Sequence, residues 1–77
     1  MRRAIAVRGG AIRLGQLLKL AGVVDSGSEV KALLGEQGAR VNGQPESRRG
    51  RQLRVGDVVQ VGQEELELVA SAQQGEA

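Results

Sequence analysis

The chain has 77 residues, a net charge of +2, and no cysteine, histidine, phenylalanine, tyrosine or tryptophan. This composition excludes disulfides and thiolate zinc sites, the commonest general base, and the aromatic rings on which many proteins stack nucleic-acid bases. The apolar runs are only a few residues long, too short for a membrane span or a signal peptide. We therefore expect one small cytoplasmic domain that binds a partner and catalyses no reaction.

The N-terminal third of the sequence predicts a short strand followed by a helix. Residues 3–8 alternate as in a strand, and the pair Gly9-Gly10 breaks the pattern. From Ile12 the spacing becomes helical, and Gly22 is a suitable residue to end the helix. The apolar stripe of this helix consists of Leu14, Leu17, Leu18 and Ala21.

A second helix is predicted directly after the first. Ser26 is a good N-cap residue, and Glu29 three positions later completes the sequence pattern of a capping box. The apolar stripe of this helix consists of Val30, Leu33 and Leu34. Each helix has only about two to three turns, too few to persist alone, so both must pack on the rest of the chain.

The second half of the sequence predicts short strands joined by turns. Residues 39–41 alternate, the pair Asn42-Gly43 is a strong signal for a tight turn, and Pro45 fits a sheet edge or the turn itself. Residues 58–61 form a β-branched strand. Residues 65–68 alternate strictly, with their leucines inward and their acids outward.

The order of these elements predicts an α+β fold. One strand, two helices and three strands follow one another, so we expect two short helices packed on a small, mostly antiparallel sheet. No internal repeat or linker divides the chain. We expect a single domain over residues 1–70 and a disordered tail over residues 71–77.

Charge is distributed unevenly along the chain. Residues 1–54 contain all eleven basic residues and four acids, a net charge of +7, whereas residues 55–77 contain five acids and no base. Nine of the eleven bases are arginine, whose forked guanidinium suits contacts with phosphate. The pattern favours a polyanionic partner, with a solvated surface, an acidic membrane or an acidic protein as the alternatives.

No group of residues in the sequence has the pattern of a catalytic, cofactor or metal site. Glu65 and Glu67 share one face of a strand, but we expect that face to be solvated. Ser26 lacks a base that would activate it, and Gly9-Gly10 lacks the residues of a phosphate-binding loop. A site for a hard cation would need more oxygen ligands on a dedicated loop. We therefore predict no catalytic residue, no cofactor and no metal.

The densest group of cations places four guanidiniums within seven residues: Arg48, Arg49, Arg51 and Arg54. Close like charges repel, so such a segment gains most when phosphates neutralise it, unless it is merely a soluble loop. Arg13 and Lys19 on the first helix and Lys31 on the second extend this patch if they are more than solvated surface residues. Without aromatic rings, we expect recognition of the shape and backbone of double-stranded or folded RNA, with DNA a weaker candidate.

Five segments in this order and spacing carry a resemblance to a known family. They are Ile12–Gly22, Ser26–Leu34, Val41–Gly43, Arg48–Leu53 and Gly56–Val59. Together they resemble the RNA-binding domain first described in small-subunit ribosomal protein S-four, which also occurs in pseudouridine synthases, some aminoacyl-tRNA synthetases and a ribosome-associated heat-shock protein. The resemblance covers residues 12–61. With no catalytic domain attached, the sequence looks most like the small stand-alone bacterial members.

The resemblance implies an RNA surface built from the first helix, the start of the second, and the strand and loop that follow. Position by position, it implies RNA contacts from Arg13, Lys19, Ser26, Lys31, Arg40, Arg48, Arg49 and Arg51. Arg54 is added on its charge alone. Two positions depart from the family pattern, because Gly27 replaces a residue that is often basic and Gln37 replaces a frequent glycine, with Gly38 one place later.

The sequence thus predicts a non-catalytic, monomeric module that binds folded RNA, either ribosomal or transfer RNA, with the ribosome as a candidate partner. Arginine and lysine contacts with phosphates supply the mechanism. Ser26 and Asn42 either add polar contacts or serve only as a helix cap and a turn residue. The alternative is a protein-interaction adaptor that offers the acidic strand Glu64–Val69 to a partner as a sheet edge.

Overall fold

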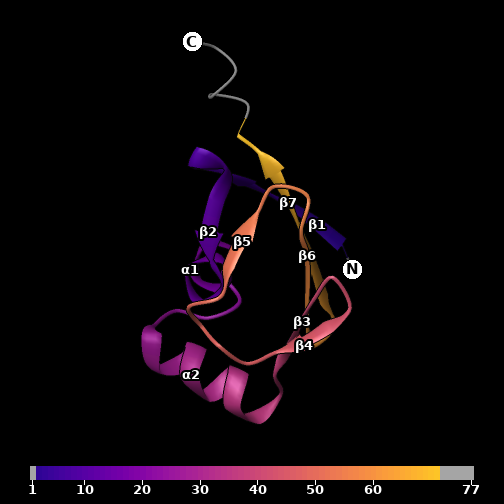
Figure 1. Ribbon diagram of the computed structural model, residues 1–77. Coiled ribbons are helices and arrows are strands. Elements are labelled where there is room, and N and C mark those ends of the chain that lie inside the picture. The colour runs from indigo at the N-terminus through magenta and orange to yellow at the C-terminus, as the bar shows by residue number, and fades with distance from the viewer. Residues whose placement is uncertain (1, 72–77) are drawn as a thin grey trace.

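The structure, a computed structural model, describes residues 2–71, so the predicted tail at 71–77 lies outside the described residues from residue 72 onward. Two helices pack against a sheet, which confirms the predicted α+β fold (Figure 1). The strands are β1 (Arg2–Val7), β2 (Ala11–Arg13), β3 (Ala39–Val41), β4 (Gln44–Glu46), β5 (Gln52–Arg54), β6 (Val58–Val61) and β7 (Glu64–Ala70). The helices are α1 (Leu14–Leu20) and α2 (Gly27–Glu36), and a short 3-10 turn, η1 (Arg8–Gly10), joins β1 to β2.

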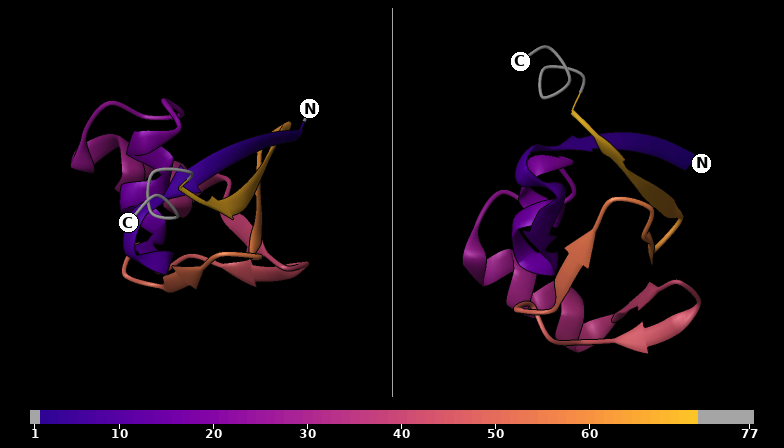
Figure 2. Two further views of the ribbon diagram at one scale, coloured as in Figure 1. Left: turned by 90° about the horizontal axis from the view of Figure 1, so that it is seen from above. Right: turned by 45° about the horizontal axis from the view of Figure 1, so that its top comes forward.

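Most strands belong to one five-stranded sheet with the order β1-β7-β6-β3-β4. In this sheet β1 runs parallel to β7, and all other neighbours are antiparallel, as the sequence predicts. The remaining strands, β2 and β5, pair with each other as a separate antiparallel ribbon. This ribbon lies beside α1 and encloses the core together with the helices and the main sheet (Figure 2).

The acidic strand β7 is an interior strand of the sheet, so the predicted use of Glu64–Val69 as a free edge is wrong. One side of β7 pairs with β1 and the other with β6. Arg2 Nε donates to Glu65 Oε1 at 3.0 Å, and Arg3 Nε donates to Glu64 Oε1 at 3.1 Å. The basic start of the chain therefore neutralises part of its acidic end across the sheet.

Helix α1 begins at Leu14, two residues later than the spacing predicts. Ile12 and Arg13 instead belong to β2, where their backbone pairs with β5. The predicted apolar stripe is confirmed, because all of its members are buried in the core. The helix ends at Leu20, and Gly22 terminates it as predicted, since the φ of 76° at this residue permits the Schellman hydrogen bonds that follow the last turn.

Helix α2 begins with the predicted cap. The Ser26 hydroxyl accepts from Glu29 N–H at 3.3 Å, while the Glu29 carboxylate accepts from Asp25 N–H instead of the Ser26 N–H of a regular capping box. Its predicted stripe packs on the core through Val30, Leu34 and, less completely, Leu33. Gln37 keeps a helical backbone and Gly38 has a φ of 74°, so the later glycine ends this helix.

The predicted turn at Asn42-Gly43 joins β3 to β4, and the φ values of 52° and 84° at its two residues are those of a type I′ turn. Asn42 Nδ2 donates to Asp57 Oδ1 at 3.0 Å, and Asn42 Oδ1 accepts from Val58 N–H at 2.9 Å. This side chain is thus used within the fold, which favours the turn-residue interpretation. Pro45 lies on the edge strand β4, as predicted.

The β2-β5 ribbon was not predicted, because the helical spacing assigns Ile12 and Arg13 to the first helix and leaves Gln52–Arg54 without a partner strand. The middle residue of β5, Leu53, is fully buried, and its cross-strand partner Ile12 packs against the same core. The ribbon therefore contributes to stability as well as to the surface.

Leu53→Ala should lower the free energy of unfolding by about 2–5 kcal/mol, because a buried leucine loses its contacts and leaves a cavity. The same substitution at Leu20, which is 57% exposed, should change it by less than about 0.5 kcal/mol. Urea unfolding followed by far-ultraviolet circular dichroism measures both variants. Equally small losses would show that the ribbon is not part of the cooperative core.

Candidate nucleic-acid interface

The predicted basic loop is a tight turn that docks onto the start of α1. Arg51 N–H donates to Arg48 O at 3.1 Å and closes the turn around Arg49. Arg49 O accepts from Gly15 N–H at 2.9 Å. Arg51 O accepts from Leu14 N–H at 2.8 Å. The first N–H groups of a helix lack intrahelical partners, so the carbonyl groups of the turn cap α1.

The turn and α1 approach each other so closely that residue 15 must be small. A Cβ atom on Gly15 would lie 3.3 Å from Arg49 Cβ and 3.4 Å from both Arg49 O and Val30 Cγ1. These distances are already tight for a single carbon atom. A larger side chain at this position would therefore displace the turn, α2 or both.

A buried carboxylate holds the turn from the side of the sheet. Glu46 lies on β4 opposite the buried Ala39, and its side chain is only 7% exposed. Its Oε2 accepts from Arg48 N–H at 3.0 Å and from Arg48 Nε at 3.1 Å. Its Oε1 accepts from Arg48 Nη2 at 3.2 Å and from Arg51 Nη1 at 2.8 Å. The hydrogen bonds from Arg48, together with that from Arg51, lower the pKa of Glu46 to about 2.

Cations from three separate segments line a cleft between the two helices and the turn. Arg13 reaches it from the end of β2, Lys19 from α1, and Arg49 from the turn. The cleft has a volume of about 240 Å³, and its other lining residues are Gly15, Gln16, Gly27, Val30 and Gly50. A neighbouring hollow of about 410 Å³ is lined by Lys31 from α2 and shares Arg49. Neither lining contains an acid, and none of these four cations forms a salt bridge within residues 2–71.

Arg54 continues this surface along the β2-β5 ribbon. The register places Arg13 opposite Gln52 and Ala11 opposite Arg54, and all four are on the outer face because the middle residue of each strand faces the core. Diagonal neighbours on such a face are about 7–8 Å apart, within reach of two long side chains. Arg13 thus belongs both to the ribbon and to the cleft.

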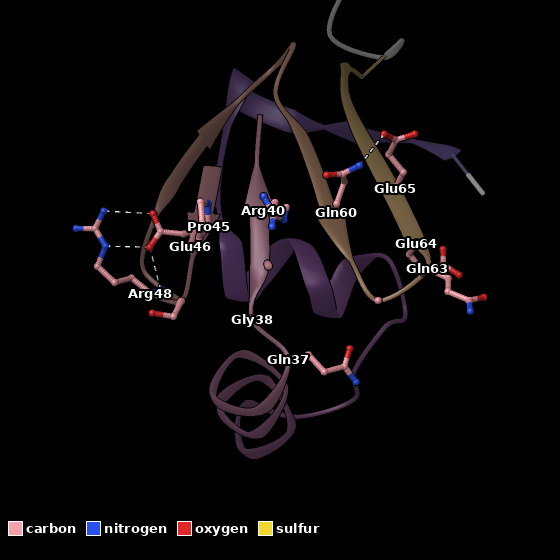
Figure 3. Close-up of a pocket in the computed structure, with 13 residues that line it drawn as sticks. Gln37, Gly38, Arg40, Pro45, Glu46, Arg48, Gln60, Gln63, Glu64 and Glu65 are labelled. Carbon is pink, nitrogen blue, oxygen red and sulfur yellow. Dashed lines mark hydrogen bonds and ion pairs between the residues drawn. The ribbon is translucent and has the colours of Figure 1, made fainter. Parts of the chain in front are cut away.

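Arg40 lies on a different surface, the solvent face of the main sheet. Cross-strand pairing aligns Pro45, Arg40, Gln60, Glu65 and Arg2 in one row. Figure 3 shows Arg40 in this row beside a hollow of about 890 Å³, with the helical part of the chain behind and below the strands. Arg48 also lines this hollow, whereas Arg49 lines the cleft, so the two side chains project to opposite sides of the turn.

The structure therefore gathers five of the nine predicted contact residues on one surface. This basic surface consists of Arg13, Lys19, Lys31, Arg49 and Arg54. Arg48 and Arg51 lie at the margin of the basic surface, where both form ion pairs with Glu46. Arg40 lies on the sheet face, and the Ser26 hydroxyl is used as the cap of α2.

Three residues that shape this surface were not predicted from the sequence. Gln16 lines the cleft, and Gln52 lies on the outer face of the ribbon beside Arg13. Glu46 anchors the turn. A local signal exists only for Gln16, which lies off the apolar stripe of α1, because the positions of the other two depend on strand pairing between distant segments.

Within residues 2–71, no three histidine, cysteine or acidic side chains lie close enough together to hold a metal ion. Neither helix in this part of the chain has the length and apolar character needed to cross a membrane.

A family model described as the S4 domain matches residues 5–69. This match covers most of the chain, so the chain belongs to the S4 domain family. It confirms the family seen in the sequence and extends the likeness from residues 12–61 to strands β1 and β7.

A small curated protein is also similar to this chain. It is named "Probable ribosome maturation protein RlbA" and comes from Bacillus subtilis (strain 168). The two are 48% identical over 61 residues, which cover 79% of this chain and 86% of the relative. The resemblance to small stand-alone members of the family is thereby confirmed.

Acid should weaken the anchoring of the turn by Glu46. Folding lowers the pKa of Glu46 from 4.5 to about 2. Its ionised carboxylate therefore stabilises the fold fully above pH 4.5, and this stabilisation is lost as the pH falls toward about 2. We expect Glu46→Gln to be less stable than the wild type at neutral pH, with a difference that shrinks as the pH falls from 4.5 to about 2. Urea unfolding at a series of pH values measures this difference.

Glu36→Gln is the matched control for this titration. The Glu36 side chain is exposed and makes no hydrogen bond or ion pair within residues 2–71, so its replacement removes no comparable contact. A stability difference for Glu46→Gln that stayed constant across the pH range would contradict the anchoring role.

Proposed function

We propose that this protein is a non-catalytic RNA-binding module that recognises structured RNA through the basic surface. The observation that carries the proposal is the convergence of Arg13, Lys19, Lys31 and Arg49 on a cleft and a neighbouring hollow whose linings contain no acid. Arg54 extends this surface along the ribbon. Such a surface attracts a polyanion and releases counterions when it binds phosphates. Membership in the S4 domain family supports this proposal, because the resemblance to that family implies RNA binding.

The chemistry of the surface favours RNA of fixed shape over a splayed single strand. The chain has no aromatic ring for stacking unpaired bases. The cleft is partly lined by Gly15, Gly27 and Gly50, so a phosphate backbone can approach the main chain closely. Cations held on packed elements match phosphates whose spacing is already set by a double-stranded or folded RNA.

The relative supports ribosomal RNA as the target. Because that protein is named for ribosome maturation, we infer that this chain also binds ribosomal RNA or a ribosomal particle, with transfer RNA as the alternative. It would act in the cytoplasm, as a monomer and without a cofactor. DNA is a weaker candidate, since neither short helix presents a row of base-reading side chains.

The predicted contact residues take different roles in this proposal. The five cations of the basic surface contact phosphates directly. Arg48 keeps a side chain that is 75% exposed while it is bound to Glu46, so it can also reach a phosphate, whereas Arg51 is 38% exposed and mainly supports the turn. Ser26 and Arg40 stay predicted contacts, and Arg40 would reach only an RNA that extends onto the sheet face.

Binding to folded RNA should depend steeply on salt. A labelled, folded fragment of ribosomal RNA should bind with a log K that falls by about 3–5 per log unit of salt, as for roughly four to six phosphate contacts. An unstructured strand of equal length is the control and should bind more weakly. Equal affinity for both would contradict recognition of shape, and the absence of binding at low salt would contradict the RNA proposal itself.

Arg49→Gln should weaken binding more than Arg40→Gln, although each removes one positive charge. Arg49 lines both the cleft and the neighbouring hollow that it shares with Lys31, whereas Arg40 lies on the sheet face. We expect Arg49→Gln to reduce affinity by about tenfold, the loss of one charged hydrogen bond, and to lower the salt slope by about 0.7–0.9. The same titration measures both variants. Equal losses would show that the RNA surface is not centred on the cleft.

A further inference from the structure

The carboxylate of Glu46 holds the turn that carries Arg49, although it does not line the cleft itself. Its four hydrogen bonds all come from Arg48 and Arg51, the residues on either side of the pair at the tip of the turn. Arg48 is bound through its backbone N–H as well as through its guanidinium, so the main chain of the turn is fixed and not only its side chains.

The same turn is bound to α1 on its opposite side. The carbonyl groups of Arg49 and Arg51 accept the N–H groups of Gly15 and Leu14. The turn is therefore held between the carboxylate of β4 and the first turn of α1, and Arg49 projects from the middle of this clamp. The contacts of Glu46 thus help to fix the main chain at Arg49 relative to Arg13 and Lys19.

We propose that Glu46 is a positioning residue of the RNA-binding surface. The inference rests on the function proposed above and deepens it. An acid beside a phosphate-binding surface ordinarily weakens binding, because it repels phosphate. Glu46 should instead strengthen binding, because its charge is already shared by two guanidiniums and its side chain is 7% exposed.

Loss of this carboxylate would leave the turn held only by its hydrogen bonds to α1. Arg48, Arg49 and Arg51 would then repel one another with no acid between them, and the RNA would have to order the turn on binding. Ordering a flexible segment opposes association. The position of Arg49 against α1 would be the first feature to be lost.

A comparison of Glu46→Gln with Glu36→Gln tests the proposal. Both substitutions raise the net charge from +2 to +3, so electrostatics alone predicts equal or tighter binding for both. We expect Glu36→Gln to match or slightly exceed the wild-type affinity for the folded RNA. Glu46→Gln should bind roughly three- to tenfold more weakly, the cost of ordering one or two side chains on binding. Tighter binding by Glu46→Gln would overturn the proposal.

Glu46→Asp separates the geometry from the charge and remains available if Glu46→Gln folds poorly. It keeps the net charge of the wild type but shortens the side chain by one methylene, so it cannot reach both arginines in the same arrangement. We expect it to bind more weakly than the wild type. Wild-type affinity in a folded Glu46→Asp variant would show that the position of this carboxylate is not important for RNA binding.

Amide hydrogen exchange distinguishes a failure of this inference from a failure of the proposed function. The N–H groups of Leu14 and Gly15 should exchange faster in Glu46→Gln than in Glu36→Gln, because the carbonyl groups that accept them belong to the turn. This result requires no RNA. If the wild type binds no folded RNA while this exchange increases, the RNA function fails and the anchoring stands. Unchanged exchange in Glu46→Gln would overturn the anchoring.

Discussion

The clamp of the basic turn between Glu46 and the start of α1 is the contact on which the candidate site depends. Helix α1 has only seven residues, and its N-cap residue, Arg13, makes no side-chain capping hydrogen bond. A helix this short is unstable alone, so the carbonyl groups of a distant turn replace the missing cap. The contacts that stabilise α1 are therefore the same contacts that place Arg49 beside Arg13 and Lys19.

Ion pairing neutralises part of the charge on the main sheet and at the base of the turn. Arg2 and Arg3 pair with acids of β7 across the main sheet, and Glu46 pairs with two arginines of the turn. Within residues 2–71, Arg13, Lys19, Lys31 and Arg49 form no salt bridge and lie around the helices and the turn. A chain with a net charge of only +2 can therefore present a strongly positive surface on one side. Its attraction for a polyanion is local, which limits adsorption through the rest of the molecule.

Local patterns in the sequence predicted the helices, the Ser26 cap, the Asn42-Gly43 turn and the strict alternation of β7. These features depend on neighbouring residues, so they can be recognised from spacing alone. The β2-β5 ribbon, the interior position of β7 and the burial of Glu46 depend on pairing between segments up to about sixty residues apart. The family resemblance implied four of the five cations of the basic surface, and Arg54 was added on its charge alone, but only these long-range contacts separate Arg40 from Arg49.

The composition also explains why the placement of a few side chains matters so much here. Without aromatic rings, the proposed interface gains nothing from stacking, and with Gly27 it lacks one cation that the family often has. A Cβ at Gly27 would contact nothing within 4 Å, so the missing side chain is a lost charge and not a steric requirement. Affinity must then come from few phosphate contacts. A turn whose main chain is already fixed does not have to be ordered when RNA binds, so a rigid turn compensates for the small number of contacts.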